Sequence, residues 1–195
     1  MIHFEYPEGA TPIDPDDAQG LLLPHIRTRN ELDRWEEENI LEAEDAVFRR
    51  KQKNILTEKY ACTLHKKMFG DVWHWAGKFR RSQKNIGIEW IGVPTALRQL
   101  FDEVNGWLEF DSFPPDEIAA RFHHRLVAIH AFPNGNGRHA RLMADILLVH
   151  MLGQERFSWG QHNLTNAGDC RRSYIDALRA ADLHDYQPLL TFVRS

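Results

Sequence analysis

The stretch HAFPNGNGRHAR, residues 130–141, gathers residue types that could act together in catalysis. A histidine has an ordinary pKa of about 6.5, so the neutral imidazole of His130 could remove a proton from a hydroxyl near neutral pH. The turn at residues 135–137 contains two glycines, which can bring bare backbone amides close to a ligand. Arg138 and Arg141 share one face of a helix and could hold separate phosphate oxygens. This spacing favours attack of a hydroxyl on a phosphorus atom of a bound polyphosphate.

Two helices must position these residues. Apolar residues recur at helical spacing from Ile118 to Ile129, which predicts a core-packed helix over residues 114–129 that ends at His130. The run RLMADILLVHML is apolar nearly all round, which predicts a central helix over residues 136–152. Unpaired N–H groups and the positive end of the helix dipole converge at its start. The glycine turn is therefore predicted to be an anion-binding cradle beside His130.

The remaining sequence predicts an all-α fold with one short β-hairpin. Capping residues and helical spacing predict further helices at residues 28–51, 57–69, 95–108, 167–180 and 188–193. Within Ile86–Ile91 apolar residues alternate with glycine and glutamate, and glycines and a proline bracket the segment, as in a hairpin. Residues 1–27, with four prolines, predict an extended N-terminal arm, and residues 28–195 predict a single domain.

Composition and charge exclude several classes of protein. With 43% hydrophobic and 27% charged residues among 195, the composition is that of an ordinary globular protein. A net charge of -4 leaves no basic surplus, so direct nucleic-acid binding is not expected. Asp145 and His150 interrupt the longest apolar stretch, and the N-terminus lacks a secretory pattern. Cys62 and Cys170 lie far apart without CxxC spacing. Together these features predict a cytoplasmic protein that does not enter a membrane.

The same twelve residues resemble the Fic motif, HxFx(D/E)GNGRxxR. The matching positions are His130, Phe132, Gly135, Asn136, Gly137, Arg138 and Arg141. The resemblance extends to WAGKFR, to the hairpin segment IGIEWIGVP, and to YIDALRAAD and DYQPLL, so it covers residues 30–192. Within the Fic family the chain is most similar to the mobile mystery protein B group, with its PIDPDDAQGL arm. The resemblance implies a Fic-type helical domain.

The resemblance also implies an enzyme, a protein adenylyltransferase. Fic proteins move AMP from ATP to a Ser, Thr or Tyr hydroxyl of a target protein, a reaction called AMPylation. By this resemblance His130 is the catalytic base, and Phe132 is a core anchor. The implied nucleotide-binding residues are Gly135, Asn136, Gly137, Arg138 and Arg141. The implied flap, which would pair with an extended segment of the target by β-augmentation, consists of Ile86, Gly87, Ile88, Glu89, Trp90 and Ile91.

Asn134 departs from the family pattern. Family members that transfer AMP usually carry Asp or Glu there, which holds a Mg²⁺ ion between the α and β phosphates. Asparagine offers a carbonyl oxygen without charge, so Mg²⁺ binding is expected to be weak or indirect. Loss of one preorganised electrostatic contact could slow transfer about 10²-fold. Asp145, four residues after Arg141, is expected to orient that arginine.

RWEEEN, residues 34–39, partly matches the inhibitory pattern (S/T)xxxE(G/N) of Fic proteins, with Arg34 in place of Ser or Thr. By this resemblance Glu38 and Asn39 are inhibitory, with Glu38 pairing with Arg141 and excluding the γ-phosphate. Asn39 lies on the expected core-facing stripe, which would turn Glu38 inward. A solvated acidic face explains the glutamates equally well. The stripe consists of Leu32, Trp35, Ala43 and Ala46.

Two other functions stay open beside transfer of AMP. Asn134 could leave a nucleotide-binding regulatory scaffold without catalysis, or the chain could be a phosphotransferase that moves a phosphoryl group. Partners beyond the protein target could include an antitoxin-like regulator.

Overall fold

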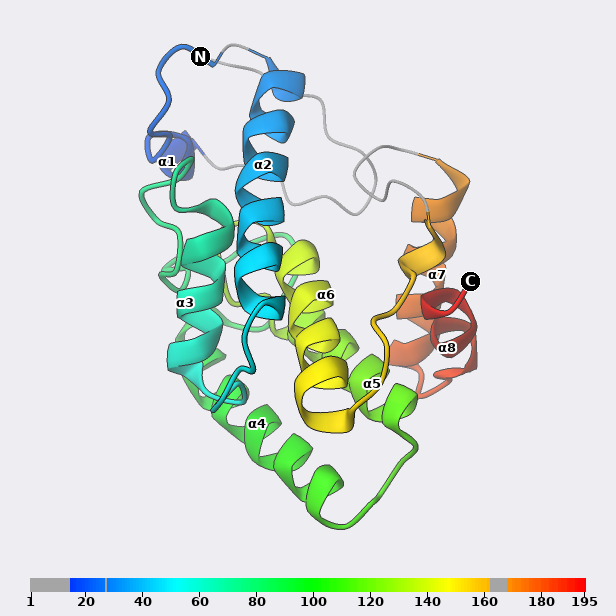
Figure 1. Cartoon of the computed structure of the whole chain (residues 1–195). Coiled ribbons are helices and arrows are strands. Elements are labelled where there is room, and N and C mark those ends of the chain that lie inside the picture. Colours follow the sequence, from blue (N-terminus) through cyan, green and yellow to red (C-terminus); the bar gives the residue numbers. More distant parts are fainter. Residues whose placement is uncertain (1–14, 27, 162–167) are drawn as a thin grey trace.

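The computed structural model describes residues 15–26, 28–161 and 168–195, and it confirms the all-α prediction (Figure 1). Short 3-10 turns lie at Trp90–Gly92 and Trp159–Gln161, and a π-helical turn, Leu148–Leu152, follows the central helix. The α-helices of the described ranges are α1 (Pro15–Ala18), α2 (Arg29–Phe48), α3 (Glu58–Phe69), α4 (Val93–Glu109), α5 (Pro115–Ile129), α6 (Asn136–Leu147), α7 (Asp169–Asp182) and α8 (Gln187–Val193).

Local sequence signals set where the helices begin. At the start of α2 the Thr28 hydroxyl accepts from the Glu31 N–H at 3.2 Å, and the Glu31 carboxylate accepts from the Thr28 N–H at 2.9 Å. This reciprocal pair is a capping box, which satisfies two otherwise unpaired donors. Thr57 caps α3 in the same way, by accepting from the Tyr60 N–H at 3.2 Å. Both caps agree with the predicted helix starts.

Helix α6 is the centre of the molecule. Figure 1 shows it between α2 on one side and the pair α7 and α8 on the other. It contacts α2, α3 and α5, and its apolar side chains from Leu142 to Leu147 are almost completely buried. A second apolar cluster joins α5 and α6 to α7 and α8. The predicted central helix is confirmed, and the helices packed around α6 fix its position.

The hairpin prediction was wrong. Among the described residues 86–91 there is no strand, and the segment consists of bends followed by the 3-10 turn at Trp90. The guanidinium of Arg80 donates to the carbonyls of Ser82 and Ile88, so a buried side chain occupies groups that strand pairing would need. The flap is therefore a loop wrapped around an arginine.

The predicted N-terminal arm is described only from residue 15. Residues 15–18 form α1 instead of an extended chain. The next residues do run along the domain, because Leu22 N–H donates to the Val72 carbonyl at 2.9 Å and His74 N–H donates to the Gly20 carbonyl at 2.8 Å. Among the helices described here, none has both the length and the apolar character needed to cross a bilayer.

Candidate active site

His130 terminates α5 in a left-handed conformation. Its backbone has φ 55° and ψ 61°, and its N–H donates to the Leu126 carbonyl at 3.2 Å. Positive φ is uncommon for a residue other than glycine and costs free energy that the surrounding packing must supply. The side chain is only 4% exposed. The fold thus holds the imidazole in one place beside the motif loop.

Burial lowers the pKa of His130 from 6.5 to about 4. The positive charges of Arg80 and Lys84 contribute to this lowering of the pKa, and a backbone hydrogen bond with Val127 offsets part of it. The imidazole is therefore neutral at pH 7. A neutral imidazole is the form that can accept a proton from a hydroxyl.

The motif loop brings backbone amides to the start of α6. Gly135 has φ 76°, and a Cβ atom placed there would lie 2.5 Å from Cζ of Phe69, so only glycine fits. Gly137 is different, because a Cβ there would meet nothing closer than Nη1 of Arg141, 3.9 Å away. A Cβ at Gly137 would therefore make only ordinary van der Waals contact with the Arg141 guanidinium.

The Asn136 side chain is occupied within the loop. Its Oδ1 accepts from the Phe132 N–H at 2.9 Å, and its Nδ2 donates to the Phe132 carbonyl at 2.8 Å. Because both of its polar groups are used, the Asn136 side chain shapes the loop.

His65 supports the motif loop, although no sequence pattern marks it. Its ring stacks on Phe132 with 3.8 Å between centroids, and its Nδ1 accepts from the Gly77 N–H at 3.0 Å. The other nitrogen, Nε2, therefore carries the hydrogen and donates to the Asn134 carbonyl at 3.1 Å. Burial lowers the pKa of His65 well below its usual value. A lone histidine in a helix carries no pattern that could have identified this role.

The two motif arginines have different surroundings. Arg138 Nη1 lies 2.7 Å from Oε2 of Glu36, whose other oxygen accepts from Nε1 of Trp73 at 2.6 Å. Arg141 has no carboxylate partner within the described residues, and its guanidinium lies 5.8 Å from the ring centroid of Tyr174. Arg141 is therefore available to an anion, whereas Arg138 is already neutralised.

The predicted contact between Glu38 and Arg141 is absent from the described part of the chain. Glu38 is exposed, and the carboxylate that reaches the motif is Glu36, which is 2% exposed. The buried positions of α2 are Leu32, Glu36, Asn39, Ala43 and Val47, whereas Trp35 and Ala46 are exposed.

Asn39 is buried, as expected, but for another reason. Its Nδ2 donates to Oδ2 of Asp71 at 3.1 Å, and its Oδ1 accepts from the Asp71 N–H at 3.2 Å. Asn39 thus fastens α2 to the segment after α3 and does not turn Glu38 inward. An inhibitory role for Glu38 through Arg141 therefore has no geometric basis.

Asp145 does not orient Arg141. Its carboxylate accepts from the Phe157 N–H at 3.1 Å and from Nε1 of Trp159 at 3.1 Å. Burial raises the pKa of Asp145 to about 6. Tyr174 is the residue beside Arg141, and its hydroxyl lies 2.9 Å from Nε2 of His123.

The residues at the motif do not fit a protein-bound Mg²⁺ ion. Oδ1 of Asn134 already accepts from the Gly135 N–H at 2.6 Å. It is a neutral oxygen, whereas Mg²⁺ in nucleotide sites takes carboxylates together with phosphates. In the residues described here, no group of three or more His, Cys, Asp or Glu could hold a metal ion.

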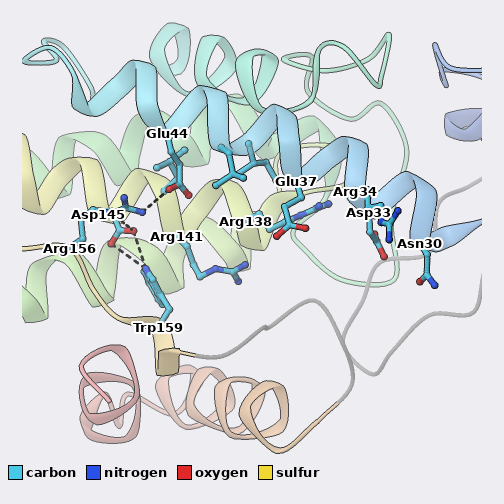
Figure 2. Close-up of a pocket in the computed structure, with 13 residues that line it drawn as sticks. Asn30, Asp33, Arg34, Glu37, Glu44, Arg138, Arg141, Asp145, Arg156 and Trp159 are labelled. Atoms are coloured by element: carbon cyan, nitrogen blue, oxygen red, sulfur yellow. Dashed lines mark hydrogen bonds and ion pairs between the residues drawn. The ribbon is translucent and has the colours of Figure 1, made fainter.

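A cavity of about 420 Å³ opens between α2 and α6 (Figure 2). Arg138 and Arg141 project into it from α6. Arg34 lines one end, and Arg156, which bonds Glu44 at 2.9 Å, lines the other. The volume of the cavity lies in the range of about 300–1,000 Å³ that is typical of small-molecule sites.

The flap lies against His130. A Cβ atom placed on Gly87 would be 2.5 Å from Cβ of His130, so the flap backbone touches the histidine. Ile86, Trp90 and Ile91 are 39%, 37% and 66% exposed. The structure therefore brings the flap and His130 together, with exposed apolar side chains beside them.

Known proteins match the region of the chain that contains the motif. Residues 55–148 match the model of the Fic/DOC family. A protein adenylyltransferase Fic of Aedes aegypti is 31% identical over 144 residues, which are 72% of this chain and 27% of that protein. The same values hold for the protein of that name in Culex quinquefasciatus. The chain thus spans about a quarter of the length of these curated relatives.

Solved structures have the same fold. The N-terminal Fic domain of a VirB-translocated Bep effector protein from Bartonella quintana has a TM-score of 0.70 and 15% identity, with 87% of this chain and 84% of that chain covered. BepC from Bartonella tribocorum, solved with bound AMPPNP, has a TM-score of 0.67 and 17% identity, with 87% of each chain covered. The motif geometry, the family model and these relatives agree that residues 55–148 of this chain are similar to the Fic/DOC family.

Proposed function

We propose that this chain transfers AMP from ATP to a Ser, Thr or Tyr hydroxyl of a target protein. The observation that carries the proposal is a neutral imidazole, His130, beside the amino end of α6, where Arg141 has no carboxylate partner among the described residues. Curated relatives named as adenylyltransferases support the same reaction.

In the proposed reaction the His130 imidazole takes the proton of the target hydroxyl, and the oxygen attacks the α-phosphorus of ATP. The bond between that phosphorus and the oxygen bridging to the β-phosphate breaks, and pyrophosphate leaves with the electron pair. The target keeps AMP through a phosphodiester bond, and the proton remains on the imidazole. Amides at the start of α6 and the Arg141 guanidinium stabilise the charge on the departing pyrophosphate.

ATP is the proposed nucleotide because the site offers backbone amides at the start of α6 together with the Arg141 guanidinium, which suits a chain of phosphates. BepC, a protein of this fold, was solved with bound AMPPNP, which is an ATP analogue, and this complex supports the choice. Arg138 must share its contact with Glu36, or lose it, before it can bind a phosphate. We propose that any Mg²⁺ ion arrives with ATP and meets no protein carboxylate at Asn134.

The proposed target docks on the flap. Ile86, Trp90 and Ile91 offer apolar side chains to it, and Gly87 places the docked segment next to His130. Because the flap is a bent loop, side-chain contacts carry more of this docking than continuous strand pairing would.

The test is intact-mass spectrometry of the purified chain, and of a host lysate, after incubation with ATP and Mg²⁺. Gain of an adenylyl mass on a protein is expected. His130→Asn is the matched control, because asparagine tolerates positive φ and lacks the base, and it should abolish the gain. Gain of a phosphoryl mass would instead identify a phosphotransferase. Binding of ATP without any gain, by wild type and His130→Asn alike, would identify a regulatory scaffold.

A further inference from the structure

Arg80 is a buried cation that bonds to three separate carbonyl groups. Its side chain is 2% exposed. Nε donates to the His130 carbonyl at 2.6 Å, Nη1 donates to the Ser82 carbonyl at 3.0 Å, and Nη2 donates to the Ile88 carbonyl. Its backbone N–H donates to the carbonyl of Ala131 at 3.0 Å. One residue therefore bonds to the end of α5, to the motif loop, to the segment before the flap and to the flap itself.

No carboxylate compensates this charge among its described contacts. A buried guanidinium is costly unless its donors are hydrogen-bonded, and burial lowers the pKa of Arg80. A neutral apolar side chain could fill the same volume without this cost. The planar guanidinium of arginine, however, can hold several carbonyls at fixed relative positions, which an apolar side chain cannot do.

The carbonyls that Arg80 holds belong to the two parts that must meet in the proposed reaction. His130 has a left-handed backbone, and its carbonyl direction is fixed by the bond from Nε. Ile88 lies next to Gly87, whose backbone approaches the His130 side chain so closely that a Cβ there would be 2.5 Å from the Cβ of His130.

We propose that Arg80 is a positioning residue that seats the flap on His130, so that a hydroxyl of a docked target segment meets the imidazole. This inference rests on the proposed function for its catalytic consequence, but the seating of the flap can be measured without it. Lys84 attaches the segment before the flap to α1, because its Nζ lies 2.5 Å from Oδ2 of Asp17.

The first test uses hydrogen exchange of residues 82–91 in wild type, Arg80→Lys and Arg80→Gln. Both variants lose the fork, so the exchange of this segment should accelerate at least tenfold, while the exchange of α6 stays unchanged. Arg98→Lys is the matched control, because Arg98 is exposed and pairs with Glu58 at 3.6 Å instead of with a carbonyl of the flap. Unchanged protection of residues 82–91 in both Arg80 variants would overturn the inference.

The second test follows His130 by NMR. Arg80 and Lys84 are the cations that lower the His130 pKa, so this pKa should rise in Arg80→Gln. It should be lower in Arg80→Lys than in Arg80→Gln, because lysine keeps a positive charge. A His130 pKa equal to that of wild type in Arg80→Gln would show that the guanidinium does not act on the histidine.

The third test separates target presentation from nucleotide binding. Arg80→Lys should reduce transfer to a target at least tenfold at saturating ATP, with the Kd for ATP within twofold of wild type, because the phosphates are held by α6. A transfer rate in Arg80→Lys equal to that of wild type would overturn the catalytic consequence of the inference. Absence of transfer in wild type would instead reject the proposed function, and the exchange experiment would still decide whether Arg80 seats the flap.

Gly87→Ala keeps the inference testable if the Arg80 variants do not fold. The added Cβ would lie 2.5 Å from Cβ of His130 and 3.1 Å from Nη2 of Arg80, so it would push the flap away from His130 while the Arg80 side chain is retained. Faster exchange of residues 82–91 and loss of transfer, with ATP binding intact, are expected. Full transfer by folded Gly87→Ala would contradict the need for a seated flap.

Discussion

Glu36 and Arg138, which are 102 residues apart in the sequence, meet at 2.7 Å and join α2 to the first turn of α6. The glutamate is buried and also accepts from Trp73. The proposed phosphate-binding arginine is thus neutralised by the fold itself before any ligand binds.

Replacing Glu36 should therefore strengthen nucleotide binding while weakening the fold. In Glu36→Gln an oxygen still accepts a hydrogen bond, but the charge that competes with phosphate is gone. We expect ATP affinity to rise several-fold, measured by calorimetry, and the free energy of unfolding to fall by about 1–3 kcal/mol. Glu38→Gln, on the exposed face, should change neither quantity. An ATP affinity that stays the same or falls in Glu36→Gln would show that the pair does not compete with phosphate.

The transfer rate should be insensitive to mild acid. The base must be neutral, and the pKa of His130 is about 4, so the neutral fraction stays near one from pH 7 to pH 5.5. A histidine with a pKa of about 6.5 would lose about eightfold over that interval. The single-turnover rate with saturating ATP, measured on folded protein, checks this. A rate that falls with an apparent pKa near 6.5 would assign the base to another group or to an exposed imidazole.

The fold should lose stability in acid. The pKa of His123 is about 3, those of His130 and His139 are about 4, and that of His65 lies well below its usual value. The unfolded chain binds protons near pH 6.5 and the native chain does not, so the free energy of unfolding falls as pH drops from about 6.5 to about 4. Each histidine contributes up to ~1.4 kcal/mol per pH unit in that window.

Asp145 acts in the opposite direction, because its pKa is raised to about 6, but one carboxyl opposes four imidazoles. Urea unfolding at pH 7 and pH 5 measures the difference. Equal free energies of unfolding at the two pH values would contradict the burial of these imidazoles as neutral groups.

Asn134→Asp should create the carboxylate that the motif lacks. Aspartate has the same shape, so it can keep the acceptor for the Gly135 N–H and add a negative charge. We expect Mg²⁺-dependent transfer to rise by up to about 10²-fold. Asn134→Ala, which also loses the bond to Gly135, should lower transfer. Identical rates for wild type and both variants, at limiting and saturating Mg²⁺, would exclude a metal-related role for this position.

Replacing the two motif glycines by alanine should affect different properties, the stability at Gly135 and the ATP affinity at Gly137. Gly135→Ala must place a Cβ against Phe69 at positive φ, so we expect a loss of stability of about 2 kcal/mol or more. Gly137→Ala has room for its Cβ, which would enter the space facing Arg141. It should keep the melting temperature and lose ATP affinity. Similar melting temperatures for both variants would refute this distinction.

The sequence predicted the helices because their signals are local. Thr28 and Thr57 cap the helices that they were expected to start, and the apolar run after the motif is the central helix. The sequence misled where a polar side chain is buried by a distant partner. Glu36 takes a core position because Trp73 and Arg138 satisfy it, and no periodicity can express that.

The same limit explains the flap. Alternation of apolar residues at 86–91 is typical of a hairpin, and only the three-dimensional position of Arg80 shows why the strands do not form. His65 stayed unnoticed for a related reason, because its partners Gly77 and Asn134 come from two other segments of the chain.

The central position of α6 sets the shortest fragment of this chain that can be expressed as folded protein. The segment that matches the family model, residues 55–148, includes α6 but omits α2, α7 and α8, which cover it. A fragment trimmed to that match would leave Trp73 and Arg138 without their buried carboxylate and would expose the apolar cluster beneath α7 and α8. Such a fragment should aggregate, so the boundaries of sequence similarity are narrower here than the boundaries of cooperative folding.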